Sequence, residues 1–297
     1  MDELPPSVVT SLPVDHRGSY VHLCGVSVPD SKINPLLFIH DINQQSDDFQ
    51  HLLGICQKHK LSSYVYDLRG HGRSGNLLGH VRNFEDHASD LLQVTSWIKH
   101  LENRRPPILV GYGLGALVAN EFAHQFSDSL SGLALVAPLN ELKSPPFLAE
   151  KLFIRAMSEL WPMFRMRTPR FPQHQSVYQY QLYTVKYLNE IYQAIERFET
   201  NFIEYSGNIL LICPEQSQFF SYQKLKKSVA LFKDQNLIHV DLNCDHFLFE
   251  AKSQHLAHVM HIILEWINKI SIEEKVSNVV TPISKKKKKL NLAVDSA

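Results

Sequence analysis

The sequence has no net charge and no long apolar run. It contains 30 Lys and Arg residues against 30 Asp and Glu residues. This balance excludes a generally basic nucleic-acid-binding chain and an acidic disordered chain. Because no window of about 18 apolar residues occurs, we expect no membrane span. The N-terminus begins MDELPP and lacks the basic, then apolar, pattern of a secretory signal. We therefore expect a cytoplasmic protein.

Cysteine is scarce, and its spacing carries no motif. There is no CxxC pair and no Cys/His zinc pattern, so a reduced compartment is the simplest interpretation. The 16 histidines form no H-x-x-x-H pair with a third ligand at usable spacing, and His258 and His261 fall on the surface of a predicted helix. We expect no metal site and no cofactor. The four cysteines are Cys24, Cys56, Cys213 and Cys244.

Short apolar runs alternate with segments of helical periodicity along most of the chain. Apolar residues at helical spacing predict helices over 84–102, 114–126 and 253–270. This alternation predicts an α/β fold with a mostly parallel sheet covered by helices on both faces. The runs that predict buried strands are rich in branched or aromatic residues and bounded by turn formers; they are 35–39, 63–68, 107–111, 132–137, 208–213 and 237–241.

Residues 141–205 interrupt this alternation. They contain many aromatic residues but no clear strand. We interpret them as a helical cap inserted over the carboxyl edge of the sheet, where open α/β sheets bind ligands. The aromatic side chains could line an acyl-chain pocket, although packing against the sheet explains most of them. We expect residues 17–270 to form one domain that includes this cap, preceded by a separate segment at 1–16.

The C-terminal residues 271–297 carry a net charge of +3, and the first 270 residues carry −3. Most of the positive excess is the run Lys285–Lys289, and we expect a disordered, solvated tail. The run could also attract anionic lipid, at about 1 kcal/mol per lysine near a membrane surface. Binding of nucleic acid, or nuclear import, is a further alternative for this tail and is not expected elsewhere.

One turn has the form of a catalytic motif but lacks its nucleophile. Residues 111–115, Gly-Tyr-Gly-Leu-Gly, follow a predicted strand and begin a predicted helix, as the G-x-S-x-G nucleophile elbow does. The central residue is Gly113, which offers no hydroxyl, thiol or carboxylate and is the least strained occupant of such a turn. A glycine-rich strand–helix turn is common. A dinucleotide motif is disfavoured because three strands precede the turn and residue 116 is alanine.

Three further motifs stand where strands end. His40-Asp41 follows the first predicted strand, the D-x-R-G-x-G-x-S loop at 67–74 follows the next, and Asp245-His246-Phe247 precedes the last helix. With the elbow, these motifs make residues 17–270 resemble the α/β-hydrolase superfamily. The resemblance is to its monoacylglycerol lipase and lysophospholipase branch, the serine aminopeptidase S33-like group. It implies the α/β-hydrolase fold, with a mostly parallel central sheet and a helical cap.

The resemblance assigns positions to the catalytic groups of the family. It places the nucleophile at Gly113, the acid at Ser217 and the base at His246, so two members of the triad are degenerate. The oxyanion-hole donors would be the backbone N–H groups of Ile42 and Leu114. Removing the nucleophile from a triad costs on the order of a million-fold in kcat.

Other carboxylates near these positions leave alternatives open. Asp41 stands where the family commonly has glycine, and its charge would oppose a developing oxyanion unless it points away to cap the next segment. Glu215 and Glu141 are the nearby carboxylates that could replace the acid, although solvated loop charges are the simpler interpretation of both. His246 is interpreted either as a packed relic or as a residual proton-transfer or ligand group.

We therefore expect a pseudoenzyme that keeps the hydrolase fold and binds a lipid-like small molecule or a protein partner. The first alternative is an active esterase or lysophospholipase-like enzyme. It would use His246 to activate water, with Glu215 or Glu141 as a substitute acid. The second alternative is an adaptor tethered through its basic tail.

Overall fold

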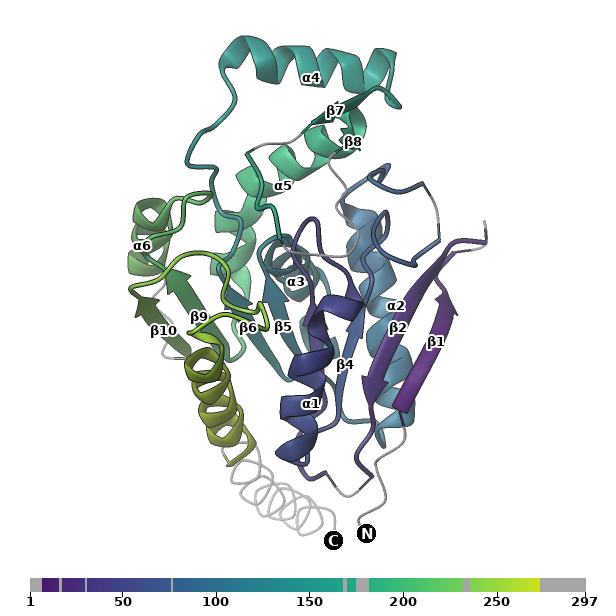
Figure 1. The fold of residues 1–297 in the computed structure, drawn as a ribbon, viewed down its shortest axis with the longest axis vertical. Helices are drawn as coiled ribbons and strands as arrows, with labels where there is room; N and C mark the ends of the chain where they lie inside the picture. Colours follow the sequence, from purple (N-terminus) through teal and green to yellow (C-terminus); the bar gives the residue numbers. More distant parts are fainter. Residues whose placement is uncertain are drawn as a thin grey trace, which may run out of the picture.

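The computed structural model describes residues 7–15, 18–29, 31–75, 77–167, 170–174, 182–231 and 236–272. Most of the expected tail at 271–297, including Lys285–Lys289, lies outside these ranges. The central sheet has eight strands (Figure 1), which are β1 (Ser7–Pro13), β2 (Tyr20–Val26), β3 (Leu36–Ile39), β4 (Ser63–Tyr66), β5 (Ile108–Tyr112), β6 (Gly132–Val136), β9 (Ile209–Pro214) and β10 (Leu237–Leu242).

The strand order is β1-β2-β4-β3-β5-β6-β9-β10. The six strands from β4 to β10 in this order are parallel, and β1 and β2 are antiparallel to their neighbours. Every residue of β3, β4, β5 and β6 is buried, as expected for strands covered on both faces. All six strands predicted from apolar runs are present, within two residues at each end.

The sheet begins earlier than expected. β1 pairs along its whole length with β2, so residues from Ser7 onward belong to the domain whose start we had placed at 17. The sequence of β1 gave little sign of a strand because most of its side chains are exposed or half-buried. An edge strand of this kind lacks the continuous apolar run by which the central strands were found.

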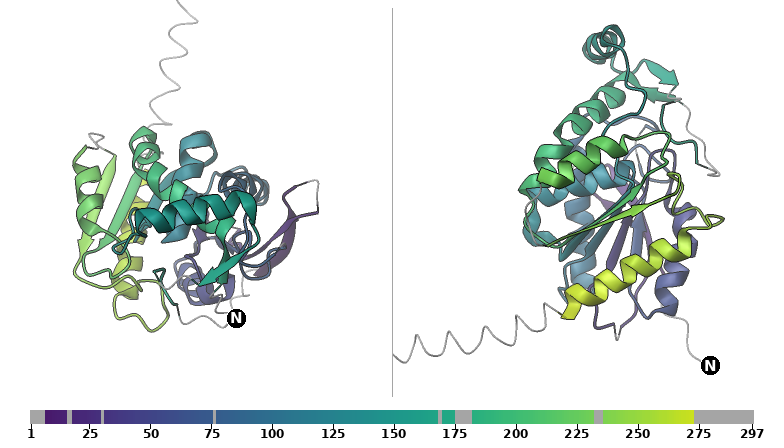
Figure 2. Two further views of the ribbon diagram at one scale, coloured as in Figure 1. Left: turned by 90° about the horizontal axis from the view of Figure 1, so that it is seen from above. Right: turned by 90° about the vertical axis from the view of Figure 1, so that its left-hand side faces the viewer.

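Helices cover the sheet on both faces, as predicted. The described helices are α1 (Gln50–Lys58), α2 (Glu85–Leu101), α3 (Leu114–Gln125), α4 (Leu148–Leu160), α5 (Val185–Glu204), α6 (Tyr222–Leu231) and a last helix over 256–272. One apolar core lies between the sheet and α2, α3 and α5. The other lies between the sheet and α1 with the last helix, which occupy the same side of the molecule in Figure 2.

The predicted cap differs in two ways from the expectation. It contains a two-stranded antiparallel sheet, β7 (Arg165–Arg167) with β8 (Leu182–Thr184), so the prediction of a region without strands was wrong. In addition, α5 is not only a cap helix, because its buried residues from Tyr187 to Phe198 belong to the core of the sheet. The outer cap is therefore α4 with the β7–β8 pair (Figure 1).

The outer cap carries apolar side chains on its surface. Ile154 is the buried apolar residue of α4, whereas the exposed large side chains include Phe147, Leu148, Leu152, Phe153, Leu160 and Trp161. Packing therefore does not account for these cap residues. Among the described residues, no helix combines the length and the apolar character needed to cross a membrane.

Candidate functional site

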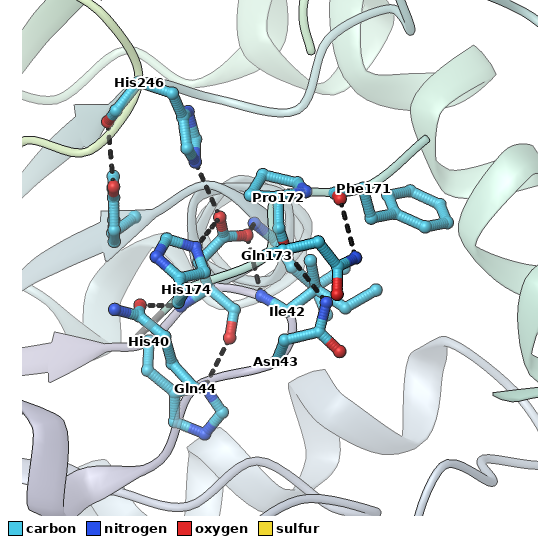
Figure 3. A network of polar contacts seen from close by, with 12 residues as sticks. His40, Ile42, Asn43, Gln44, Phe171, Pro172, Gln173, His174 and His246 are labelled. Carbon is cyan, nitrogen blue, oxygen red and sulfur yellow. Dashed lines mark hydrogen bonds and ion pairs between the residues drawn. The ribbon is translucent and has the colours of Figure 1, made fainter. Parts of the chain in front are cut away.

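The candidate site lies where the parallel strands end. Asp41 is two residues beyond β3, Gly113 directly follows β5, and His246 follows β10. Parallel strands present their carboxyl ends at one edge, and hydrogen bonds join these segments there (Figure 3). The cap contributes His174, from the described segment 170–174 between β7 and β8.

Gly113 has the backbone conformation of a sharp strand-to-helix turn. Its φ is 55° and its ψ is −112°, and α3 begins at the next residue. A positive φ favours glycine because other residues are strained there. Gly111 and Gly115 are equally constrained by space. A Cβ on Gly111 would overlap the start of α3, and one on Gly115 would overlap the backbone after β3. The turn is thus a nucleophile elbow in shape.

A second constraint at Gly113 comes from Asp41. A Cβ built on Gly113 would overlap the carboxyl group of Asp41. The carboxylate therefore occupies the space in which a nucleophile at position 113 would stand. The alternative in which Asp41 points away from the site is not what the structure shows.

The oxyanion-hole positions are also taken by Asp41. Its Oδ1 accepts hydrogen bonds from the backbone N–H of Ile42 at 2.7 Å and of Leu114 at 2.6 Å. These are the two donors that the resemblance assigned. In a hydrolase such donors stabilise the oxyanion of a tetrahedral intermediate. Here they bind an anion that the chain itself supplies.

The other carboxylate oxygen of Asp41 contacts two histidines. Its Oδ2 lies 2.7 Å from Nε2 of His246 and 2.9 Å from Nε2 of His174, and Figure 3 shows the two labelled histidines. All three side chains are at most 1% exposed. The His246 ring stacks on Tyr112, with centroids 5.1 Å apart. The Tyr112 hydroxyl donates to the backbone carbonyl of His246.

Burial and hydrogen bonding shift the pKa values of these three groups in different directions. Burial opposes ionisation of Asp41, but hydrogen bonds from His174 and His246 outweigh it, so the pKa of Asp41 lies below its ordinary value. Burial also opposes protonation of His174, but its hydrogen bond to Asp41 and the nearby carboxylate of Glu250 raise its pKa overall. At His246 burial dominates and lowers the pKa. These shifts favour an Asp41–His174 ion pair and a neutral His246.

This arrangement blocks the base. A carboxylate only accepts hydrogen bonds, so a neutral His246 must carry its proton on Nε2 to bond Asp41. A catalytic histidine needs that nitrogen free to take a proton from the nucleophile. The opposite nitrogen, Nδ1, is buried and has no hydrogen-bond partner among the described residues. Among the described residues, no acid contacts Nδ1 of His246, and its Nε2 is bonded to Asp41.

The expected acid positions do not reach His246. Ser217 is buried, and its Oγ accepts from the backbone N–H groups of Phe219 and Phe220, so it closes its own turn. Glu215 is exposed. The carboxylate of Glu141 lies 3.6 Å from Nζ of Lys224. Among the described contacts, none joins any of these three side chains to His246.

The D-x-R-G-x-G-x-S loop supports the site without entering it. The Asp67 carboxylate accepts from the backbone N–H groups of Ser46 and Arg73. Arg69 pairs with Asp90 and Asp15. Nε2 of His40 accepts from the N–H of Leu68. These bonds fix the loop after β3, and with it the position of Asp41.

Among the described residues, two groups of side chains have the ligand types and spacing of a metal site. Asp41, His174 and His246 form one, and Cys213, His239 and Asp241 form the other. The expectation of no metal site considered histidine spacing along the chain and could not detect either group, because each joins distant segments. His174 was missed altogether. It has no motif around it, and only the folded cap brings it to Asp41.

Comparisons with known proteins agree with this architecture. The family model described as Serine aminopeptidase, S33 matches residues 33–235, which confirms the resemblance to that group. No curated protein was found to match the chain. Solved structures do match, including a monoacylglycerol lipase from Paleococcus ferrophilus with a TM-score of 0.70 and 13% identity, covering 89% of this chain and 99% of that chain.

Two further structures show the same fold. One is a monoglyceride lipase from Saccharomyces cerevisiae, with a TM-score of 0.69 and 13% identity over 90% of this chain and 98% of that chain. The other is a carboxyl esterase from Bacillus coagulans, with a TM-score of 0.72 and 14% identity over 89% of this chain and 99% of that chain. At such identities the likeness establishes the fold alone.

Proposed function

The chain belongs to the serine aminopeptidase S33 family, and we propose that it is a member without serine-hydrolase activity whose former active site is filled by its own Asp41. The observation that carries this proposal is the pair of hydrogen bonds from Ile42 and Leu114 to Oδ1 of Asp41. An anion already bound in the oxyanion hole excludes the oxyanion of an ester substrate.

The expected loss of rate exceeds that of a simple nucleophile deletion. A triad without its serine retains roughly a thousand- to ten-thousand-fold acceleration over water, supplied by the oxyanion hole and substrate binding. In this chain Asp41 fills the hole, so that residual contribution is removed as well. The fold and the buried polar network remain. We therefore propose a binding role for the protein.

We propose a lipid-like ligand or surface as the binding partner. The support is the exposed apolar set on and beside α4, which includes Leu148, Leu152 and Trp161. Exposed apolar groups of this kind mark interaction sites when they are contiguous. Leu152→Glu should weaken binding of the full chain to neutral phosphatidylcholine vesicles. The control is Glu159→Gln on the same helix, which removes a charge from an exposed position and should not weaken it.

The second candidate is an active hydrolase with a non-standard site. The contact between Asp41 Oδ2 and His246 Nε2 favours it, because a carboxylate–histidine pair can activate water in general acid–base catalysis. Asp41 would then take the part that we had considered for Glu215 or Glu141. The complete burial of the pair counts against this candidate.

Two assays test the proposal. Wild-type protein should neither be labelled by a fluorophosphonate probe nor turn over short-chain esters or monoacylglycerol. Labelling, or turnover that is abolished by His246→Ala, would contradict it. Turnover without labelling that requires both Asp41 and His246 would support the second candidate.

A reconstruction series tests the role of Asp41 directly. Gly113→Ser with Ser217→Asp restores nucleophile and acid but keeps Asp41, and we expect no probe labelling. Adding Asp41→Gly empties the hole and the space at residue 113, so the triple variant should be labelled. If the probe labelled the double variant to the same extent as the triple variant, Asp41 would not block the site.

A further inference from the structure

We propose that Asp41, His174 and His246 form a binding site for a divalent transition-metal ion, with Zn²⁺ as the best match. Oδ2 of Asp41 and a ring nitrogen of each histidine lie within 4.8 Å of one another. This inference goes beyond the proposed function because it assigns a ligand to the filled site. It does not depend on whether hydrolysis has been lost.

The donor set is one that such ions prefer. Two imidazoles with one carboxylate bind Zn²⁺ in catalytic sites and non-haem Fe²⁺ in oxygenases, leaving at least one position for water. The ligand-forming atoms here come from three separate segments: the loop after β3, the cap and the loop after β10. Convergence of three distant segments on one buried point is what a metal site requires.

The observed distances already fit an ion with little movement. Oδ2 of Asp41 lies 2.7 Å from Nε2 of His246 and 2.9 Å from Nε2 of His174. Zinc bonds to nitrogen and carboxylate oxygen are about 2.0–2.2 Å long, which places neighbouring ligand atoms about 3.3–3.6 Å apart around a tetrahedral ion. Each histidine nitrogen must therefore move away from Oδ2 by less than about 1 Å for the cluster to become one face of a coordination sphere.

Groups behind the ligands hold them in orientation. Oδ1 of Asp41 is fixed by the N–H groups of Ile42 and Leu114, which leaves Oδ2 for the ion. Nδ1 of His174 lies 3.4 Å from Oε1 of Glu250. A carboxylate behind a ligating histidine fixes the ring and strengthens it as a ligand. The His246 ring is held by stacking on Tyr112.

A cavity reaches one of the three ligands. Its volume is about 300 Å³, and its lining includes His174, Glu250, Asp47 and Asp48. Lys252 is the one lysine in this lining. The three carboxylates outnumber that lysine, and an excess of charge of one sign in a cleft raises the local concentration of counter-ions. The cavity therefore attracts cations to the side of His174.

Titration of the metal-stripped full chain with Zn²⁺ and Co²⁺ tests the site. We expect one Zn²⁺ per chain by calorimetry, with Co²⁺ giving visible bands of a nitrogen- and oxygen-ligated ion. His174→Gln and Asp41→Asn should each weaken Zn²⁺ binding by at least about 100-fold. Mutation of a residue that only hydrogen-bonds to a metal ligand already lowers metal affinity by about 10- to 100-fold. The matched control is His239→Gln in the second group, Cys213, His239 and Asp241, which should leave binding unchanged.

The outcomes separate this site from its alternatives. Failure of the wild type to bind Zn²⁺, or binding unaffected by His174→Gln, would overturn the inference. A thiolate-to-cobalt charge-transfer band in the wild type would assign the ion to Cys213 instead, even if the variants failed to fold. Absence of Zn²⁺ binding leaves the proposed loss of serine chemistry intact. Zinc-dependent ester turnover without fluorophosphonate labelling would support the site and leave that loss intact, because zinc-bound water would then be the nucleophile.

Discussion

The carboxylate of Asp41 occupies the space that a side chain on Gly113 would need. The two residues are 72 positions apart in the sequence, yet the residue type at one position restricts which residue types fit at the other. A side chain at residue 113 can be accommodated only if residue 41 is small or moves out of the site. The glycine at the elbow is thus required by its neighbour as well as by its positive φ.

This relationship predicts a coupled effect on stability. Gly113→Ser alone should lower the free energy of unfolding by about 2–6 kcal/mol, because it adds backbone strain of about 1–3 kcal/mol and overpacking of similar size. In the Asp41→Gly background the overpacking is gone, so the same substitution should cost less. Urea denaturation of the two single variants and the double variant measures the coupling free energy. A coupling below about 0.5 kcal/mol would contradict the overlap.

The buried ion pair predicts a large effect at Asp41 itself. Asp41→Ala leaves His174 and two backbone N–H groups without their acceptor, and breaking a buried pair in this way costs about 3–5 kcal/mol. Asp47→Ala is the matched control, because Asp47 also pairs with a cation, Arg73, but both side chains are substantially exposed. Exposed pairs contribute about 0–1 kcal/mol. Equal effects of the two substitutions on unfolding in urea would show that Asp41 is not paired as described.

The sequence was sufficient for the architecture and for the positions of Gly113 and His246. Buried parallel strands are continuous apolar runs, and the motifs that follow them identify one edge of the sheet. The edge strand β1 was not predicted because its exposed residues form no such run. The β7–β8 pair was not predicted because strands of three residues are too short to show an alternation of apolar and polar residues.

The contents of the site required the folded chain. Asp41 was recognised as unusual, but its backbone allows the side chain either to turn outward or to enter the site, and the sequence left both open. His174 lies 60 residues after Leu114 and 72 residues before His246. Its approach to Asp41 depends on how the cap folds back over the sheet, which local periodicity does not encode.

The lysine run gives a prediction for residues outside the described ranges. If Lys285–Lys289 attract anionic lipid, the full chain should bind phosphatidylserine vesicles more tightly than a chain lacking 283–297. Because the attraction is electrostatic, binding should weaken as ionic strength rises. Vesicle sedimentation at low and high salt measures both effects. Binding that is independent of salt, or equal in the two chains, would remove the adaptor alternative.

Buried neutral histidines predict a loss of stability in acid. Burial, together with the nearby His40, lowers the pKa of His71 from 6.5 to about 3, and its ring packs on Tyr183 and Tyr187. In the unfolded chain His71 takes up a proton below about pH 6.5, but in the folded chain it does not. The unfolded state therefore binds more protons in this range, and the free energy of unfolding falls as the pH falls from about 6.5 toward 3.

His71→Phe isolates this contribution. It removes the titrating group while keeping an aromatic ring of similar size, so its unfolding free energy should fall less steeply in acid. The difference in slope between wild type and variant should approach about 1.4 kcal/mol per pH unit below pH 5.5. Urea denaturation at several pH values from 4.5 to about 8 measures it. Above pH 7.5 the two states of His71 are both neutral, so any remaining difference between the proteins should not change with pH. Parallel curves across the whole range would show that His71 takes up its proton at the same pH in the folded and unfolded chains.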